Sequence, residues 1–362
     1  MIEKDHHDES ALRVNEGIDQ PESLNPKAAR KFRDAIPKER DAAAYVQGIL
    51  AGNRALLSKA ITMVESALPR HQELAQEIIG ACVPFSGKST RVGITGVPGV
   101  GKSTFIEALG KYLTAQGNKI AVLAIDPSSR RTKGSILGDK TRMEDLANDP
   151  NAYIRPSSST GTLGGVARNT RESIILCEAA GFNIIFVETV GVGQSEIAVH
   201  SMVDFFLLLM LAGAGDELQG IKRGIMEMAD AIVINKADGD NIKKAQLAAR
   251  EYKNALHLFP ASPSGWTPLV ITASSTEKTG IQDTWRMVEE YLNLTHGSGY
   301  FEVRRKEQAL QAFTDTIEET IRQKFYQNPS VSSHLQSIQQ DILSGKISPY
   351  AAAKEIMKIA RG

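Results

Sequence analysis

The sequence of 362 residues predicts an α/β fold in which a mostly parallel central sheet is flanked by helices, with further helices at both ends. Three observations support this prediction. Short apolar runs alternate along the chain with segments whose apolar residues have helical spacing. A glycine-rich loop lies between one such run and the helical segment after it. Polar motifs follow other runs directly, where α/β proteins place their ligand-binding residues.

The glycine-rich loop predicts a phosphate-binding site. Residues 91–95 before it form an apolar run, and residues 103–112 after it have apolar side chains at helical spacing. In this context the backbone N–H groups of the loop surround phosphate oxygens at a helix N-terminus. Lys102 is predicted to reach the β- and γ-phosphates and Ser103 to ligate Mg²⁺, as in P-loop NTPases. The loop and its following residue are Gly96-Val97-Pro98-Gly99-Val100-Gly101-Lys102-Ser103-Thr104, which matches G-x-x-x-x-G-K-[ST].

A second motif predicts that the bound base is guanine. The apolar run 231–234 is followed by Asn235-Lys236-Ala237-Asp238, an N-K-x-D sequence. The Asp238 carboxylate can accept hydrogen bonds from N1–H and the 2-amino group of guanine, whereas adenine offers neither donor in this arrangement. Adenine would leave a buried carboxylate without partners, which is costly. Lys236 can lie along the base plane, and Asn235 can connect this loop to the glycine-rich loop.

A third strand-like run is predicted to bring main-chain donors to the base. Residues 269–273 are apolar and are followed by Ser274 and Ser275. We expect the backbone N–H groups of this Ser-Ser segment to contact the guanine O6. Alanine is usual at the position of Ser275, but the contact is made by the main chain, so this difference has little consequence.

Candidate metal and catalytic residues lie between these motifs. Asp126 follows the apolar run 119–125, and Glu188 follows the run 183–187. Carboxylates at such strand ends face the crevice where α/β proteins bind ligands. Glu188-Thr189-Val190-Gly191 resembles a D-x-x-G sequence with Glu in place of Asp. We predict that Glu188 contacts Mg²⁺ through water and that Gly191 donates its N–H to the γ-phosphate.

A polar segment with several glycines, residues 134–142, is a candidate switch. Within it we expect Asp139 near Mg²⁺ and Arg142 near phosphate. Gln194 is a candidate for positioning the attacking water, and a solvated loop glutamine is an equal alternative.

The composition fits a cytoplasmic α/β enzyme. Forty-two basic and 42 acidic residues give a formal net charge of zero, which disfavours nucleic acids and anionic membranes as partners. Cys82 and Cys177 lack metal-site spacing and fit reduced thiols. The longest apolar run, 205–214, is too short to span a bilayer and is predicted to be a buried central strand. We expect a cytoplasmic location, because the chain begins without the apolar segment of a secretory signal.

Four parts are expected along the chain. They are a mobile charged tail at 1–40, an N-terminal helical segment at 41–88, a nucleotide-binding α/β domain at 89–295, and a C-terminal helical dimerisation extension at 296–362. The extension contains an apolar stripe at helical spacing, which suits either packing within the chain or contact with a second copy. The stripe consists of Leu310, Phe313, Ile317, Ile321 and Phe325.

Together these motifs resemble the MeaB/ArgK family, the methylmalonyl-CoA mutase-associated GTPases of the SIMIBI class, which include the human methylmalonic aciduria type A protein. The resemblance covers nearly the whole chain after the tail. It is carried by residues 48–54, 93–99, 126–129, 135–143, 154–157, 161–165, 188–195 and 214–222. The departures are Ser275 for Ala, Lys278-Thr279 where Gly-Glu is usual, and Asn53 where Asp is common. None of them affects the phosphate chemistry.

The resemblance implies a metal site, a further switch and a partner. The family's Mg²⁺ site corresponds to Ser103, Asp126, Asp139 and Glu188. Its additional switch corresponds to Asp216, Gln219 and Lys222. The C-terminal helices should form a homodimer. The partner should be an adenosylcobalamin-dependent methylmalonyl-CoA mutase or a related acyl-CoA mutase. The family uses GTP there to gate cofactor loading, to protect the mutase and to reactivate it.

We expect the chain not to bind cobalamin itself, because it lacks the D-x-H-x-x-G sequence of proteins that hold cobalamin through a histidine. Hydrolysis would rest on positioning and charge stabilisation. The candidates for this role are Lys102, Glu188, Gly191, Lys222 and Arg142. No arginine finger is evident, although Arg142, Arg155 and Lys222 are candidates, so we predict slow intrinsic turnover that the partner accelerates.

Three alternatives remain open from the sequence. A nickel-insertion type metallochaperone GTPase would need a Cys/His cluster near the nucleotide, and only His6-His7 hint at one. An ATPase or kinase associated with lysine, arginine and ornithine transport is disfavoured by the N-K-x-D sequence. A scaffold that binds GTP without turnover is disfavoured by Lys102, Ser103 and Glu188.

Overall fold

The computed structural model describes residues 40–125, 143–156, 163–189, 195–213 and 223–360. All the elements below belong to one compact unit, residues 42–362. The tail 1–39 and the predicted switch segment 134–142 lie outside the described residues.

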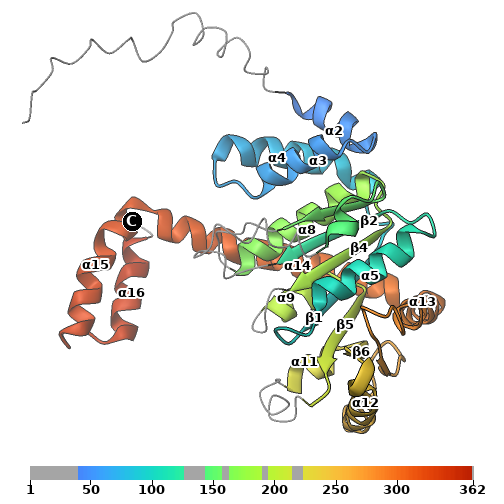
Figure 1. Cartoon of the computed structure of the whole chain (residues 1–362). Helices are drawn as coiled ribbons and strands as arrows, with labels where there is room; N and C mark the ends of the chain where they lie inside the picture. Colours follow the sequence, from blue (N-terminus) through green and yellow to red (C-terminus); the bar gives the residue numbers. More distant parts are fainter. Residues whose placement is uncertain (1–39, 126–142, 157–162, 190–194, 214–222, 361–362) are drawn as a thin grey trace, which may run out of the picture. The chain divides into compact units, whose positions relative to one another are not determined.

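Seven parallel strands form one sheet in the order β3-β2-β4-β1-β5-β6-β7 (Figure 1). The strands are β1 (Thr90–Gly96), β2 (Ile120–Ile125), β3 (Ala152–Arg155), β4 (Ile184–Thr189), β5 (Phe205–Leu211), β6 (Ala231–Asn235) and β7 (Leu269–Thr272). The interior strands are almost wholly apolar and buried, as expected for a parallel sheet with helices on both faces. The predicted α/β fold is therefore confirmed.

The chain changes direction across the sheet at β1 and β4. From β1 it runs outward to β2 and β3, returns to β4 beside β1, and then crosses to β5 on the other side of β1. Ile94 of β1 is paired with both Glu188 of β4 and Leu207 of β5. The carboxyl ends of β1 and β4 thus lie together at a switch point in the strand order, where open α/β sheets bind ligands.

Helices cover the sheet, with α8 and α9 on one side of the strands and α5 and α13 on the other (Figure 1). The helices of this region are α5 (Lys102–Thr114), α7 (Glu144–Ala147), α8 (Leu163–Ala179), α9 (Ser195–His200), α11 (Arg223–Met228), α12 (Ile242–Leu256) and α13 (Ile281–Ser298), with 3₁₀ turns η1 (Val83–Phe85) and η3 (Gly239–Asn241). No helix of the described part is both long and apolar enough to cross a bilayer.

Three helices precede the sheet, and they pack on one another and on α8. They are α2 (Ala42–Leu50), α3 (Arg54–Val64) and α4 (Pro69–Cys82). Asn53 begins α3 as a side-chain cap, because its Oδ1 accepts hydrogen bonds from the backbone N of Ala55 at 3.0 Å and of Leu56 at 3.1 Å. Asparagine thus serves as the N-cap of α3, in the same way as the aspartate that is common at this position.

The C-terminal part is helical and consists of α14 (Tyr300–Gln327), α15 (Pro329–Leu343) and α16 (Pro349–Ile359). Ser348 caps α16, since its Oγ accepts a hydrogen bond from the backbone N of Ala351 at 3.2 Å. The predicted stripe on α14 is not covered by the described residues. Its members Leu310, Phe313, Ile317 and Ile321 are 68, 65, 41 and 63% exposed, whereas its fifth member, Phe325, is partly buried.

Two details of the sheet differ from the sequence prediction. The edge strand β3 was not predicted, because Ala152–Arg155 has only one β-branched residue, whereas the equally short Leu269–Thr272 of β7 has three in a row. The apolar run 205–214 was predicted to be one strand, but β5 ends at Leu211.

Asp149 joins α5 to the turn before β3. Its Oδ2 accepts hydrogen bonds from Lys111 Nζ and Thr114 Oγ1, both at 2.8 Å, and its Oδ1 accepts from Asn151 N at 2.9 Å. Desolvation raises the pKa of this carboxyl, but the hydrogen bonds and the Lys111 charge together lower the pKa from 3.8 to about 2. The charged form is therefore the one that stabilises the fold.

Because the folded-state pKa is lowered, the stabilisation by Asp149 is present above pH 4 and is lost as the pH falls towards 2. We expect Asp149→Asn to lower the free energy of unfolding at pH 7 by about 1–2 kcal/mol. The difference from the wild type should shrink towards pH 2.5, as measured by urea denaturation at several pH values. Asp145→Asn, at an exposed aspartate of α7, is the control. Equal destabilisation by Asp149→Asn at pH 7 and pH 2.5 would contradict the assignment.

Candidate nucleotide-binding site

The glycine-rich loop connects the end of β1 to the start of α5. Gly96 lies so close to β5 that a Cβ atom there would be 2.3 Å from the backbone oxygen of Leu209. Gly101 precedes α5 with a φ of 89°, in the left-handed region that favours glycine. A side chain at Gly101 would also approach Asn235 Nδ2 at 3.2 Å. Both glycines are therefore required by the close approach of neighbouring strands to the loop.

Lys102, at the first position of α5, folds back over the loop. Its Nζ donates hydrogen bonds to the backbone oxygens of Gly96 at 2.9 Å and Val97 at 3.4 Å. Burial lowers the pKa of this amine, and the carboxylates of Glu188 and Glu196 oppose that effect. The ammonium group is thus held against the loop by backbone oxygens, and its contact with phosphates stays a prediction.

Ser103 and Glu188 are brought together by the pairing of β1 with β4. Ser103 Oγ donates a hydrogen bond to Glu188 Oε1 at 3.3 Å, and Glu188 is only 5% exposed. Next to Glu188 in β4, the Thr189 hydroxyl lies 2.8 Å from the Thr95 hydroxyl of β1. A hydroxyl and a carboxylate are the hard oxygen donors that Mg²⁺ prefers, so this pair fits the predicted metal site. The other two predicted ligands, Asp126 and Asp139, lie outside the described residues, among which no group of three potential metal ligands occurs.

The N-K-x-D loop lies beside the glycine-rich loop. Asn235 is buried, and its Nδ2 donates a hydrogen bond to the backbone oxygen of Val100 at 2.8 Å, so the predicted connection of the two loops is present. Its Oδ1 accepts a hydrogen bond from Ser275 Oγ at 3.0 Å. Lys236 has a φ of 58°, and its side chain passes near Gly101. One asparagine therefore joins all three sequence motifs.

Asp238 is held by two hydroxyls. Its Oδ2 accepts hydrogen bonds from Ser274 Oγ at 2.5 Å and from Thr276 Oγ1 at 3.2 Å. The sequence prediction assigned only backbone contacts to Ser274, and it missed Thr276. The available signal was the run of hydroxyl residues directly after β7, because Ser and Thr at such positions often bond neighbouring polar groups.

Glu196 is a further residue of this site that the sequence prediction missed. It lies in the first turn of α9, is 0% exposed, and acts electrostatically on Lys102. A buried carboxylate requires a compensating charge or hydrogen bonds. The signal in the sequence was an acidic residue at a helix start, a short distance after Glu188.

One predicted residue, Arg155, is not brought to this site. Arg155, one of the candidate fingers, forms an ion pair with Glu65 and a hydrogen bond to Thr62, so the structure assigns it to contact with α3. The remaining predicted residues lie outside the described residues. They are Arg142, Gly191, Gln194, Asp216, Gln219 and Lys222.

Comparison with known proteins identifies this arrangement. The sequence model of the family described as methylmalonyl-CoA mutase-associated GTPase MeaB matches residues 57–330. The chain belongs to this family. It is therefore a P-loop GTPase of the MeaB family and binds guanine nucleotides.

Relatives and a solved structure agree with the MeaB assignment. A probable GTPase of Mycobacterium tuberculosis is 50% identical over 312 residues, which are 86% of this chain and 93% of the relative. The methylmalonic aciduria type A homolog of Mus musculus, a mitochondrial protein, is 46% identical over 86% of this chain and 77% of its own. A crystal structure of a LAO/AO transport system kinase is 36% identical, with a TM-score of 0.71 over 89% of this chain and 98% of its own.

The contacts of Asn235 predict its effect on stability. In Asn235→Ala the buried backbone oxygen of Val100 and the Ser275 hydroxyl lose their partners, so we expect the free energy of unfolding to fall by about 2 kcal/mol. Ser275→Ala removes only one of these hydrogen bonds and should cost about 1 kcal/mol or less. Urea denaturation of the nucleotide-free protein measures both values. An equal effect of the two substitutions would show that the contact with Val100 contributes nothing.

Proposed function

We propose that this GTPase binds an adenosylcobalamin-dependent methylmalonyl-CoA mutase, or a related acyl-CoA mutase, and acts on it as a GTP-dependent chaperone. The membership in a family described by its association with that mutase carries this proposal. The relative named for methylmalonic aciduria supports it. In this role the GTPase gates cofactor loading, protects the mutase and reactivates it. The cytoplasmic location and the absence of directly bound cobalamin stay predictions.

The described side chains suit the binding half of this role. Asp238, held by Ser274 and Thr276, presents its carboxylate towards the donors of guanine, and Asn235 fixes the distance between the base loop and the phosphate loop. Lys102 contacts the phosphates. Ser103 and Glu188, with Asp126 and Asp139, would hold Mg²⁺, which neutralises phosphate charge when it is bound. Gly191, Arg142 and Lys222 are the further catalytic candidates.

Hydrolysis by these residues is mainly a matter of position. The Lys102 amine and the N–H groups of the loop would stabilise charge that develops on the phosphate oxygens. The position of the amine against the loop, where it donates to Gly96 O at 2.9 Å, supports this role. Within the described residues no arginine approaches the phosphate loop through a hydrogen bond to it. We therefore infer that basal turnover is slow and that the mutase completes the site, with Asp216, Gln219 and Lys222 relaying the nucleotide state.

We also infer a homodimer through α14. The stripe of Leu310, Phe313, Ile317 and Ile321 is exposed along one helix face, and contiguous exposed apolar residues mark interfaces. Phe313→Asp should weaken dimerisation at least tenfold, because it would bury a charge in the contact. Leu258→Asp, at a position that is 77% exposed outside the extension, is the control. Sedimentation equilibrium measures both variants, and a monomeric wild type or an unaffected Phe313→Asp would contradict the inference.

The function is tested by GTP hydrolysis with and without the mutase of the same organism, with ATP as control. We expect slow hydrolysis of GTP, at least tenfold stimulation by the mutase, and no stimulated hydrolysis of ATP. A GTP hydrolysis rate that is the same with and without the mutase would contradict the proposed partner.

A substitution of Asp238 tests whether this residue recognises the guanine base. Asn in place of Asp238 loses the acceptor for the 2-amino group and gains a donor for the 2-oxygen of xanthine. We therefore expect Asp238→Asn to weaken GTP binding about 100-fold and to bind XTP more tightly than GTP, as measured by competition titration. Unchanged preference for GTP would exclude Asp238 from base recognition.

A further inference from the structure

The backbone pairing of β1 with β4 stops where the groups assigned to the metal site begin. The last paired residues of the two strands are Ile94 and Glu188. Beyond them β1 continues beside β5 as far as Gly96, and β4 continues beside β2 as far as Thr189. Thr95 and Thr189, the next residue of each strand, lie outside the register of β1 with β4. The spacing of the two strand ends is therefore set by side chains.

A hydrogen bond between two threonine hydroxyls joins the strands at this point. Thr95 Oγ1 and Thr189 Oγ1 are 2.8 Å apart, and both residues are 0% exposed. Thr95 directly precedes Gly96, the first residue of the glycine-rich loop, and Thr189 directly follows Glu188. This hydroxyl pair thus connects the start of the phosphate loop to the residue after the metal-site carboxylate.

The hydroxyl pair and the bond between Ser103 and Glu188 lie on opposite faces of the sheet. Successive side chains of a strand point to opposite faces, so Thr189 points away from the face of Glu188. Thr95 shares its face with Gly93, where an added Cβ atom would meet a side chain of α9 at 2.8 Å. Ser103 belongs to the first turn of α5, on the other side of the strands (Figure 1). The end of β4 is therefore held from both faces.

Stability alone does not explain hydroxyls at these two positions. Their neighbours Val92, Ile94 and Val187 in the same strands are apolar and buried. Replacing both partners of a buried hydrogen bond by apolar groups of the same shape is nearly neutral or even stabilising, so a pair of valines would serve the fold equally well. A hydrogen bond differs from apolar packing because it fixes a distance and a direction. The hydroxyl pair therefore suits a place where the spacing of two strands matters.

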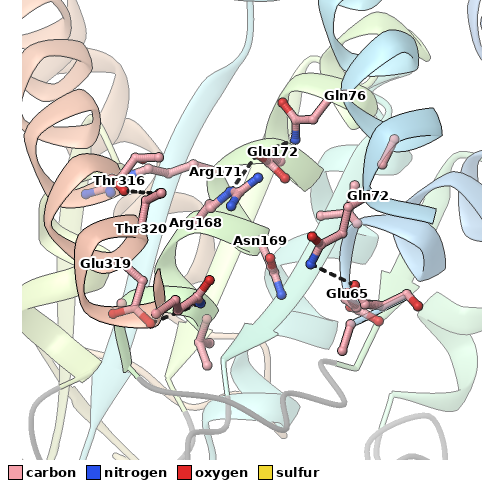
Figure 2. Close-up of a pocket in the computed structure, with 18 of the residues that line it drawn as sticks. Glu65, Gln72, Gln76, Arg168, Asn169, Arg171, Glu172, Thr316, Glu319 and Thr320 are labelled. Carbon is pink, nitrogen blue, oxygen red and sulfur yellow. Dashed lines mark hydrogen bonds and ion pairs between the residues drawn. The ribbon is translucent and has the colours of Figure 1, made fainter. Parts of the chain in front are cut away.

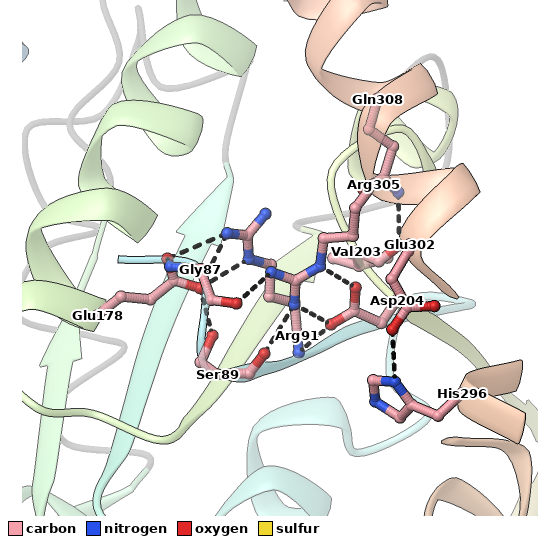
Figure 3. Close-up of polar contacts among 10 residues, drawn as sticks. All are labelled: Gly87, Ser89, Arg91, Glu178, Val203, Asp204, His296, Glu302, Arg305 and Gln308. Atoms are coloured by element: carbon pink, nitrogen blue, oxygen red, sulfur yellow. Dashed lines mark hydrogen bonds and ion pairs between the residues drawn. The ribbon is translucent and has the colours of Figure 1, made fainter. Parts of the chain in front are cut away.

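The amino end of β1 is fixed independently by charged groups (Figure 3). The backbone N of Arg91 donates a hydrogen bond to Asp204 Oδ2 at 2.8 Å, and Arg305 of α14 binds both oxygens of Asp204 at 2.7 Å. The Arg91 guanidinium donates to both oxygens of Glu178 of α8 at 2.9 and 3.0 Å. Because the start of β1 is held in this way, the hydroxyl pair acts on the other end of the strand.

The helices on the side of the hydroxyl pair, α8 and α9, pack on each other, and α8 is attached to both of its neighbours. In a pocket between α4, α8 and α14, Glu172 accepts hydrogen bonds from Gln76 of α4 at 2.9 Å and from Arg168 at 3.0 Å (Figure 2). Arg171 forms an ion pair with Asp315 of α14 at 3.0 Å. We therefore expect a change at the hydroxyl pair to alter the spacing of β1 and β4 locally.

We propose that Thr95 and Thr189 are positioning residues of the metal site, whose hydrogen bond sets the distance at which Glu188 faces Ser103. Mg²⁺ requires near-ideal octahedral geometry, so a displaced Glu188 weakens its binding. Residues that orient metal ligands typically contribute about 10- to 100-fold to metal affinity. This inference rests on the proposed function, because it concerns the Mg²⁺ role assigned there to Ser103 and Glu188.

The test measures the affinity of the full-length protein for a fluorescent, non-hydrolysable GTP analogue at a series of Mg²⁺ concentrations. Thr189→Val should raise the Mg²⁺ concentration for half-saturation about tenfold, while the affinity for the analogue without Mg²⁺ stays within about twofold. Thr189→Ser keeps the hydroxyl and should restore the wild-type Mg²⁺ dependence. Thr295→Val is the matched control and should also keep it, since Thr295 is 0% exposed and its Oγ1 donates to Tyr291 O within α13 at 2.9 Å.

Two double substitutions separate positioning from a purely structural role. Thr95→Val combined with Thr189→Val leaves no unpaired hydroxyl, so the thermal midpoint of the nucleotide-free protein should return to the wild-type value while the Mg²⁺ half-saturation stays raised. In a Glu188→Gln background, Thr189→Val should have no additional effect on Mg²⁺ half-saturation, because the hydroxyl pair acts through Glu188. Wild-type Mg²⁺ dependence in the double valine variant, or an additive effect in Glu188→Gln, would overturn the inference.

These measurements need neither hydrolysis nor the mutase. A wild-type affinity that does not depend on Mg²⁺ would overturn this inference together with the metal site. Absence of stimulation by the mutase would contradict the proposed partner only, and the effect of the hydroxyl pair on Mg²⁺ binding would stand.

Discussion

The hydrogen bond from Asn235 to the backbone oxygen of Val100 is the contact on which the nucleotide site depends. It fixes the base loop after β6 to the phosphate loop after β1, although 135 residues separate the two. Gly101 makes the contact possible, because a side chain there would approach the Asn235 amide. Ser275 completes it from the loop after β7. Specificity for a whole guanine nucleotide would require this fixed spacing, since the sequence motifs assign base and phosphates to different loops.

The phosphate side of the site is organised by buried charge. Lys102 donates to backbone oxygens of its own loop and interacts electrostatically with two buried carboxylates, Glu188 and Glu196. Such a cluster is stable only while its charges compensate one another, because single buried charges are expensive. A site balanced in this way is sensitive to the arrival of a phosphate, and this sensitivity suits the proposed role, in which a partner reads the nucleotide state.

Helix α14 is attached to the rest of the chain by polar contacts rather than by its apolar face. The start of α14 is fixed by polar contacts of Arg304, Arg305 and Gln308, whereas its apolar stripe is exposed. In a helix that packs on its own chain the apolar face is the buried one. The reversed arrangement on α14 attaches the helix firmly while it leaves the apolar face available for another chain.

The sequence by itself determined the fold class, most strands and the three nucleotide motifs. These features are local: apolar runs, glycines and polar residues at fixed spacing report the environment of a few consecutive residues. The N-cap of α16 at Ser348 was predictable for the same reason. The family resemblance was carried by equally local stretches, and the comparison with known proteins confirmed it.

Only the tertiary structure decided which distant residues meet. The roles of Glu196 beside Lys102, of Thr276 beside Asp238, and of Arg171 between Ser201 and Asp315 depend on strand order and helix packing. The edge strand β3 exists through its pairing with β2, because Ala152–Arg155, with one β-branched residue, has no strand pattern of its own. The exposure of the α14 stripe was likewise undecided by its periodicity, since a buried and an exposed apolar face have the same spacing. Only the position of the rest of the chain distinguishes them.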